Sequence, residues 1–146
     1  MKFKLILTLL IPVFFSIPCL AQNGDAVLGM WQSEHGSARI RISKGGENYN
    51  GRIVWLKDGE DESGKPKTDK NNPSEALKSK PIIGMEALSD FVYKGDGVWD
   101  GGTVYDPRTG KTYDCKLSMG PGGKLEVRAF MGISLIGKTQ TWSRVK

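Results

Sequence analysis

Gly29-Met30-Trp31 near the start of the chain and Thr141-Trp142-Ser143-Arg144 at its end bracket a run of short segments with β-type alternation. A sheet that closes into a barrel brings its first and last strands together. The early Gly-x-Trp and the late Trp-x-Arg are then neighbours across the closing seam. We expect the Arg144 guanidinium to lie against the Trp31 indole at the floor of the barrel. The predicted closure residues are Gly29, Trp31, Trp142 and Arg144.

The segments between these ends alternate apolar and polar residues with period two, the pattern of half-buried strands. In residues 38–43, for example, two isoleucines share one face and two arginines share the other. Hairpin signals separate the segments, such as Gly120-Pro121-Gly122-Gly123, where Pro and Gly stand in turn order. The chain therefore predicts an all-β, eight-stranded antiparallel up-and-down barrel, with strands at residues 29–33, 38–43, 49–56, 85–93, 98–105, 111–119, 124–130 and 137–145.

The first 21 residues have the features of a secretory signal peptide. Lys2 and Lys4 form a positive start, an apolar run follows at residues 5–15, and Cys19-Leu20-Ala21 supplies the small residues that signal peptidase inspects. We expect cleavage after Ala21, a periplasmic or secreted protein, and no transmembrane segment in the remainder. A lipoprotein attached through Cys19 is the alternative, which the neighbouring Pro18 disfavours.

Cleavage after Ala21 leaves 125 of the 146 residues, at 22–146, enough for a single domain with one core. Removing Lys2 and Lys4 lowers the formal charge from +5 to +3, and the remaining charge is spread along the chain. A nucleic-acid surface needs Lys and Arg gathered on one face. We therefore expect no nucleic-acid partner and a monomer or weak dimer.

Cys115 is the only cysteine left after removal of the signal peptide, so the mature chain has no internal disulfide. It shares a predicted strand face with Leu117 and Met119, which favours a small buried apolar side chain. A reactive or intermolecularly paired thiol is the alternative.

One long insertion, from Lys57 to Pro81, interrupts the β pattern, and its first part is highly charged. Asn72-Pro73-Ser74-Glu75 then predicts a helix start, with a side-chain cap, proline in the first helical position and a carboxylate in the first turn. We expect a short helix there. It is either a lid over one end of the barrel or a connection with no role of its own.

Catalysis has little support in the sequence. His35 is the single histidine and stands in a polar turn that we expect to be solvated. No nucleophile elbow, phosphate-binding loop or His-Glu-x-x-His motif occurs, and residues 58–62 lack the spacing of a calcium loop. We expect no catalytic residues, no metal and no cofactor. A catalytic pair of carboxylates is an alternative that the sequence leaves open, because the fold sets the distance between the two groups.

Aromatic residues on the predicted strands are the better indication of function. Small-molecule sites are apolar pockets with a few polar groups, although aromatic residues in barrels also simply fill the core. Arg128 alternates with Val127 and Ala129, so it binds a carboxylate if its face is inside the barrel and is a surface charge if that face is outside. The predicted ligand contacts are Trp55, Trp99, Tyr105, Tyr113 and Arg128.

Six motifs follow one another along the chain: Gly51-Arg-Ile-Val-Trp-Leu56, Asp69-Lys-Asn-Asn-Pro73, Pro81-Ile-Ile-Gly84, Trp99-Asp-Gly-Gly102, Tyr105-Asp-Pro107 with Gly110-Lys-Thr-Tyr113, and Gly137-Lys-Thr-Gln-Thr-Trp-Ser-Arg144. Together they resemble the exported bacterial family catalogued as domain of unknown function 2147. The resemblance covers nearly all of the chain after residue 21. It implies a small secreted or periplasmic protein with a lipocalin-like barrel, and it brings no catalytic residues to carry over.

We therefore expect an exported lipocalin-like barrel that carries or sequesters a small apolar or amphipathic ligand. The alternative is an envelope protein-interaction module that uses the barrel as scaffold and the insertion as contact surface. An open apolar cavity favours the carrier. A barrel filled with side chains, together with an exposed apolar patch, favours the interaction module.

Overall fold

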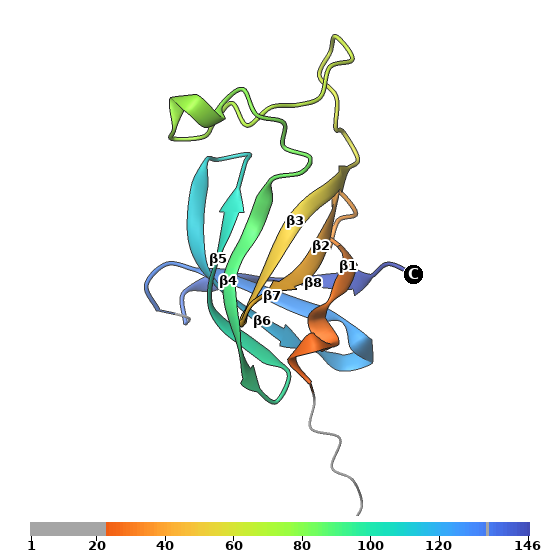
Figure 1. Cartoon of the computed structure of the whole chain (residues 1–146), viewed down its shortest axis with the longest axis vertical. Helices are drawn as coiled ribbons and strands as arrows, with labels where there is room; N and C mark the ends of the chain where they lie inside the picture. Colours follow the sequence, from red (N-terminus) through yellow and green to blue (C-terminus); the bar gives the residue numbers. More distant parts are fainter. Residues whose placement is uncertain (1–22, 134) are drawn as a thin grey trace, which may run out of the picture.

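Eight antiparallel strands form one closed barrel in the computed structural model, which describes residues 23–133 and 135–146 (Figure 1). Each strand pairs with the next, and β8 returns to β1. The predicted all-β, eight-stranded barrel is confirmed, and the predicted signal peptide lies outside the described residues. The strands are β1 (Gly29–Gln32), β2 (Ala38–Gly45), β3 (Asn48–Leu56), β4 (Glu86–Gly95), β5 (Val98–Asp106), β6 (Lys111–Met119), β7 (Leu125–Phe130) and β8 (Gly137–Arg144).

Large side chains fill the barrel interior. The fully buried ones come from five of the strands and are Trp31, Leu88, Phe91, Trp99, Leu117 and Leu125. Gly102 on β5 shows how closely they pack, because a Cβ atom there would lie 2.5 Å from the ring of Phe91. Since protein cores are packed about as densely as organic crystals, these side chains form a solid core at this level of the barrel.

A single 3-10 turn, η1 (Gly24–Val27), covers one end of the barrel (Figure 1). The Trp31 indole donates a hydrogen bond to the Val27 carbonyl oxygen at 2.8 Å, and the Trp99 indole donates to the Gly24 carbonyl oxygen at 3.0 Å. Burying an indole N–H without a partner is costly, so these bonds stabilise the packing of η1 against the core.

The two terminal motifs meet at the seam between β1 and β8, where Trp31 is in register with Arg144. The Arg144 guanidinium lies over the Trp31 indole, 4.2 Å from the ring centroid. It also donates to the carbonyl oxygens of Leu28 at 2.7 Å and Ala26 at 2.6 Å. Gly29 has φ +119°, and a Cβ atom there would lie 2.9 Å from the Arg144 guanidinium, so a larger residue would push the arginine away.

A β-bulge changes the register between β2 and β3. Ile40 pairs with Ile53 while the preceding Arg39 pairs with Trp55, so Val54 is the extra residue. A bulge of this kind re-aims the side chains that follow it. It places Trp55 on the outer surface beside Arg39, rather than on the inner face with Ile53.

The insertion at residues 57–81 lies beyond the barrel end opposite η1 (Figure 1). Its only described helical element is a three-residue 3-10 turn, η2 (Glu75–Leu77), which is preceded by Ser74 as N-cap, so the helix start predicted at Asn72 is wrong. The Asn72 side chain instead donates to Asp69 at 2.7 Å and accepts the Ser74 backbone N–H at 2.8 Å. Asparagine therefore forms a local turn here in place of a helix cap.

Candidate functional site

Two of the predicted ligand contacts, Trp55 and Trp99, lie in different environments. Trp99 is 0% exposed and packs in the core between Tyr49 and Tyr93, with ring centroids 6.4 and 5.1 Å away. Trp55 is 37% exposed on the outer surface, with the Arg39 guanidinium 4.8 Å from its ring centroid. The bulge turns Trp55 outward, so the side chains of Trp55 and Trp99 lie on opposite faces of the barrel wall.

The other three predicted contacts are also separated. Arg128 lies on the outer face of β7 and donates to the Thr139 hydroxyl at 2.9 Å, so its side chain belongs to the surface. Tyr113 is half-buried on β6, and the Tyr105 hydroxyl is directed to Asp69 in the insertion. None of the five predicted contacts lines the groove of about 490 Å³ or the pocket of about 220 Å³ described below, so their role in ligand binding stays a prediction.

A buried carboxylate fastens the insertion to the barrel. Asp69 is 1% exposed and accepts hydrogen bonds from the Tyr105 hydroxyl at 2.8 Å and from the Asn72 amide at 2.7 Å. Its backbone N–H donates to the Lys80 carbonyl oxygen at 2.9 Å, which ties the two sides of the insertion together. Burial, and then the bond to Asp69, raises the pKa of Tyr105 to about 12, so its hydroxyl stays a donor at neutral pH.

A second contact joins the insertion to the turn between β5 and β6. The Asn71 side-chain amide donates to the carbonyl oxygens of Pro107 at 3.2 Å and Arg108 at 2.9 Å. Gly110 in the same turn has φ +71°, and a Cβ atom there would overlap the Asn71 carbonyl oxygen. We call these two contacts, through Asp69 and Asn71, the insertion clamp. It holds a long polar segment in one place.

A groove of about 490 Å³ lies between the insertion and the end of β3. Ile83 on its wall is 42% exposed, and the backbone of Gly59 approaches it closely enough that a Cβ atom there would lie 3.3 Å from Ile83 Cδ1. The volume falls within the range of about 300–1,000 Å³ that is usual for ligand sites. The lining combines apolar and charged side chains: Leu56, Lys57, Asp58, Gly59, Glu60, Pro66 and Ile83.

The loop that forms the outer wall of the groove is internally bonded. The Lys57 N–H donates to the Ser37 carbonyl oxygen and the Lys67 N–H donates to the Gly59 carbonyl oxygen, both at 2.9 Å. At the loop tip, Asp61 Oδ1 accepts from the Ser63 hydroxyl at 2.7 Å and the Lys65 N–H at 3.0 Å, and these bonds lower the pKa of Asp61. These internal hydrogen bonds hold the groove wall in place.

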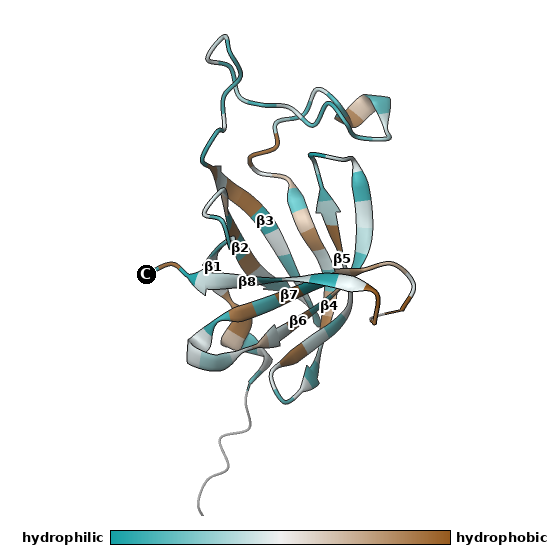
Figure 2. Cartoon of the chain, turned by 180° about the vertical axis from the view of Figure 1, so that it is seen from behind, coloured by the Kyte–Doolittle hydropathy of each residue, from teal (hydrophilic) through white to brown (hydrophobic). Residues whose placement is uncertain are grey.

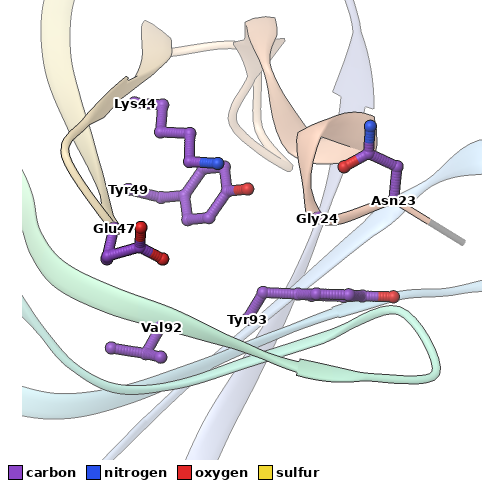
Figure 3. A pocket seen from close by; sticks show the side chains of 7 residues that line it. All are labelled: Asn23, Gly24, Lys44, Glu47, Tyr49, Val92 and Tyr93. Atoms are coloured by element: carbon purple, nitrogen blue, oxygen red, sulfur yellow. The ribbon is translucent and has the colours of Figure 1, made fainter.

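A smaller pocket of about 220 Å³ lies at the η1 end of the barrel (Figure 3). The Tyr49 hydroxyl donates to Asp25 at 2.8 Å, and the Lys44 ammonium lies 3.6 Å from the same carboxylate and 5.4 Å from the Tyr49 ring centroid. The hydrogen bond with Tyr49, and then the charge of Asp25, raises the pKa of Lys44. The pocket is lined by Asn23, Gly24, Lys44, Glu47, Tyr49, Val92 and Tyr93.

The titratable groups singled out from the sequence, Cys115 and His35, lie in opposite environments. Cys115 is 1% exposed, as predicted for a buried apolar side chain, and burial raises the pKa of its thiol to about 12. The His35 side chain is 82% exposed beside Glu34. Within residues 23–133 and 135–146, no group of three His, Cys, Asp or Glu residues is placed to hold a metal ion. The same part of the chain contains no helix with the length and apolar character to cross a membrane.

Sequence reasoning missed the insertion clamp and the groove. Asp69 belongs to the motif Asp69-Lys-Asn-Asn-Pro73, which the sequence analysis identified. Its spacing of three residues from Asn72 is the one local signal of the turn that these two residues form. The partner Tyr105 lies 36 residues away, so only the fold brings its hydroxyl to that carboxylate. Ile83 carries no local signal that distinguishes it from a strand residue.

Residues 29–144 match the model of a family described as "Uncharacterized protein conserved in bacteria (DUF2147)". The structure is similar to that of protein HP1028 from the human pathogen Helicobacter pylori, which is described as belonging to the lipocalin family. The TM-score is 0.72 at 26% sequence identity, over 82% of each chain. Among curated proteins, none matches the sequence.

Proposed function

The chain belongs to the DUF2147 family, and from that premise we propose that it is an exported binding protein that engages an envelope protein through the groove beside its insertion. The observation that carries this proposal is an ordered groove of about 490 Å³ outside a lipocalin-like barrel whose interior is filled by side chains. A carrier for a lipid-sized ligand needs the opposite arrangement, with the space inside.

The insertion clamp supports a role in recognition. A long polar loop that ordered only on binding would lose conformational entropy at that step, which weakens association. Here Asp69 and Asn71 already hold the loop against the barrel through bonds of 2.8–3.2 Å. The groove is therefore pre-organised for a partner.

The composition of the groove fits a protein partner. Its apolar part consists of Leu56, Pro66 and Ile83, and the charged side chains Lys57, Asp58 and Glu60 stand around it. Protein interfaces commonly combine an apolar centre with a polar rim. A single groove of this size supplies a small contact, which is typical of transient complexes.

A small-ligand function is the second candidate, and the pocket at the η1 end is what favours it. The rings of Tyr49 and Tyr93 and the ammonium group of Lys44 suit a small amphipathic or anionic aromatic molecule (Figure 3). Its volume of about 220 Å³ is below the usual range for drug-sized ligands, so a long acyl chain does not fit.

Site-specific photo-cross-linking in the native cells separates the two candidates. A photoreactive residue replaces Ile83 in the groove or, as the matched control, Val92 at the other pocket; these side chains are 42% and 36% exposed. We expect a discrete protein adduct from position 83. Excess wild-type protein without the photoreactive residue should abolish this adduct, whereas excess I83S protein should not. An adduct only from position 92, or a bound small molecule that V92S alone releases, would favour the carrier instead.

Export is tested on the same material by the mass of the mature chain. We expect the protein in the periplasmic or culture fraction, beginning at Gln22 after removal of residues 1–21. A full-length mass in the cytoplasmic fraction would refute export, and a lipid-modified Cys19 would support the lipoprotein alternative.

A further inference from the structure

The outer face of β1, β2 and β3 carries a group of arginine side chains beside the groove. Outward-facing residues alternate there with residues buried in the core, and the charged ones among them are all arginine, namely Arg39, Arg41 and Arg52. Lys44 on β2 has the opposite orientation and lines the pocket at the η1 end. We call the three arginines, together with the exposed indole of Trp55, the arginine face. Figure 2 shows β1, β2 and β3 side by side, with the hydrophilic insertion leaving the barrel after β3.

The arginine face adjoins the groove at two points. Trp55 immediately precedes Leu56 of the groove lining. Arg52 Nη1 donates to the Gly84 carbonyl oxygen at 2.9 Å, and Gly84 follows Ile83 on the groove wall. The groove alone supplies a small contact, whereas stable complexes bury about 800 Å² on each partner. A partner seated in the groove gains area by extending onto the arginine face.

The arrangement of the arginines is unfavourable for the free protein. Arg41 is directly opposite Arg52 in the pairing of β2 with β3, and like charges in such positions are destabilising. Arg41 makes no hydrogen bond or ion pair with any residue that the structure describes. In the same part of the chain, the Nε atom of Arg39 is buried without a hydrogen-bond partner, which also costs free energy. Folding alone therefore does not account for the placement of these charges.

The carboxylates that surround the arginine face leave Arg41 without a counter-charge. They lie on β4, in the turn between β1 and β2, and in the groove lining, and they are Glu34, Asp58, Glu60, Glu86 and Asp90. Among the ion pairs of the described residues, the one that reaches the arginine face joins Arg52 Nη2 to Glu86 at 3.8 Å. Asp90 and Glu34 are bonded instead to an asparagine amide of β3 and a backbone N–H of β8. Arg41 is therefore open to a carboxylate supplied by a partner.

The residue types on this face are those of a protein interface. Tryptophan, arginine and methionine are enriched at such interfaces and lysine is depleted, and Met30 pairs with Arg41 across β1 and β2. The Arg39 guanidinium stacks on Trp55, so both side chains are held in place before binding. We propose that the protein partner of the groove also binds the arginine face, through acidic side chains that pair with Arg41 and Arg39. This extension rests on the function proposed for the groove, because it assigns a second contact to the same partner.

Photo-cross-linking from position 83 in an R41Q background tests the extension. Removal of the Arg41 charge should lower the yield of the adduct several-fold, because a charge-assisted hydrogen bond to the partner is lost. The matched control K116Q removes one charge from β6, across the barrel from β2, where Lys116 faces outward between the buried Cys115 and Leu117. K116Q should leave the yield unchanged. R41K keeps the charge but loses the planar guanidinium fork, so its yield should be intermediate.

A thermal melt separates recognition from a structural role. R41Q relieves the repulsion between Arg41 and Arg52, so its melting midpoint should equal or exceed that of the wild type. A lower midpoint for R41Q, or equal adduct yields for R41Q and K116Q, would overturn the extension and leave the groove proposal in place. No adduct from position 83 in an otherwise wild-type chain would overturn both.

Two synthetic peptides, hexaglutamate and hexaglutamine, test the preference for acidic side chains without the native partner. The NMR signal of the Trp55 indole N–H, identified by its loss in W55F, reports on the arginine face because the Arg39 guanidinium lies 4.8 Å from the ring centroid. We expect this signal to shift with hexaglutamate and to stay in place with hexaglutamine. The same spectrum with both peptides would contradict recognition of acidic side chains.

Discussion

Replacing Tyr105 with phenylalanine removes one hydrogen bond from a buried carboxylate and keeps the ring that packs beside it. The Tyr105 hydroxyl donates to Asp69 Oδ1 at 2.8 Å, and Asp69 is 1% exposed. A hydrogen bond to a charged group contributes about 1.5–3 kcal/mol. Since about 1.4 kcal/mol corresponds to a tenfold change in an equilibrium constant, the insertion of Y105F should open roughly 10- to 100-fold more often.

Amide hydrogen exchange measures this opening residue by residue. The Asp69 amide is bonded to the Lys80 carbonyl oxygen and the Asn72 amide to the Asp69 carbonyl oxygen, so both should exchange roughly 10- to 100-fold faster in Y105F. Amides in the β6–β7 ladder should change little, because the insertion is not part of that ladder. The matched control is Y113F, since the Tyr113 hydroxyl has no hydrogen-bond partner among the described residues.

Unchanged exchange at Asp69 and Asn72 in Y105F would refute the argument that this bond holds the insertion. Equal acceleration across the whole barrel would also contradict it, because the insertion clamp would then be part of the global folding unit. Trypsin cleavage in the insertion should follow the exchange result, with faster cutting in Y105F than in Y113F.

Three further predictions concern stability and reactivity. R144A should lower the free energy of unfolding by about 1–3 kcal/mol in a denaturant titration, because the stacking on Trp31 and the two carbonyl bonds are lost; an unchanged midpoint would contradict the seam geometry. Cys115 should react with a thiol reagent at pH 8 only as fast as the protein unfolds, since burial raises its pKa to about 12; immediate reaction of the folded protein would show an accessible thiolate. The pKa of Tyr105 is raised from 10.0 to about 12, so its contribution to stability is complete below pH 10 and is lost as the pH rises toward 12. The decline in unfolding free energy above pH 10 should therefore be steeper for wild type than for Y105F, and parallel declines would contradict the shift.

The barrel could be predicted because its signals are local. Period-two alternation identifies strands, and glycine and proline in turn order identify the hairpins that join neighbouring strands. The pairing of β1 with β8 at the seam could also be predicted, because Gly29-Met30-Trp31 and Thr141-Trp142-Ser143-Arg144 stand at the two ends of the series of strands. Up-and-down connection of the strands then leaves one way to close the sheet.

The placement of candidate site residues depended on features that alternation does not reveal. The extra residue Val54 shifts the pairing of β3 by one position, which moves Trp55 from the inner to the outer face. Asn72 carries the same local signal for a helix cap and for a turn, and the nearby Asp69 carboxylate decides in favour of the turn. The Asp69 carboxylate is held in turn by a hydrogen bond from the hydroxyl of Tyr105, which lies on β5 and is distant in sequence.

Native mass spectrometry of the mature protein, isolated gently from its own cell envelope, tests most directly whether binding takes place at the groove outside a filled barrel. We expect a chain of 125 residues without extractable small molecules, together with a complex containing a second protein that is lost in the I83S variant and retained in V92S. A discrete small-molecule mass that organic extraction releases from the wild type and from I83S would contradict the proposal and identify the protein as a carrier.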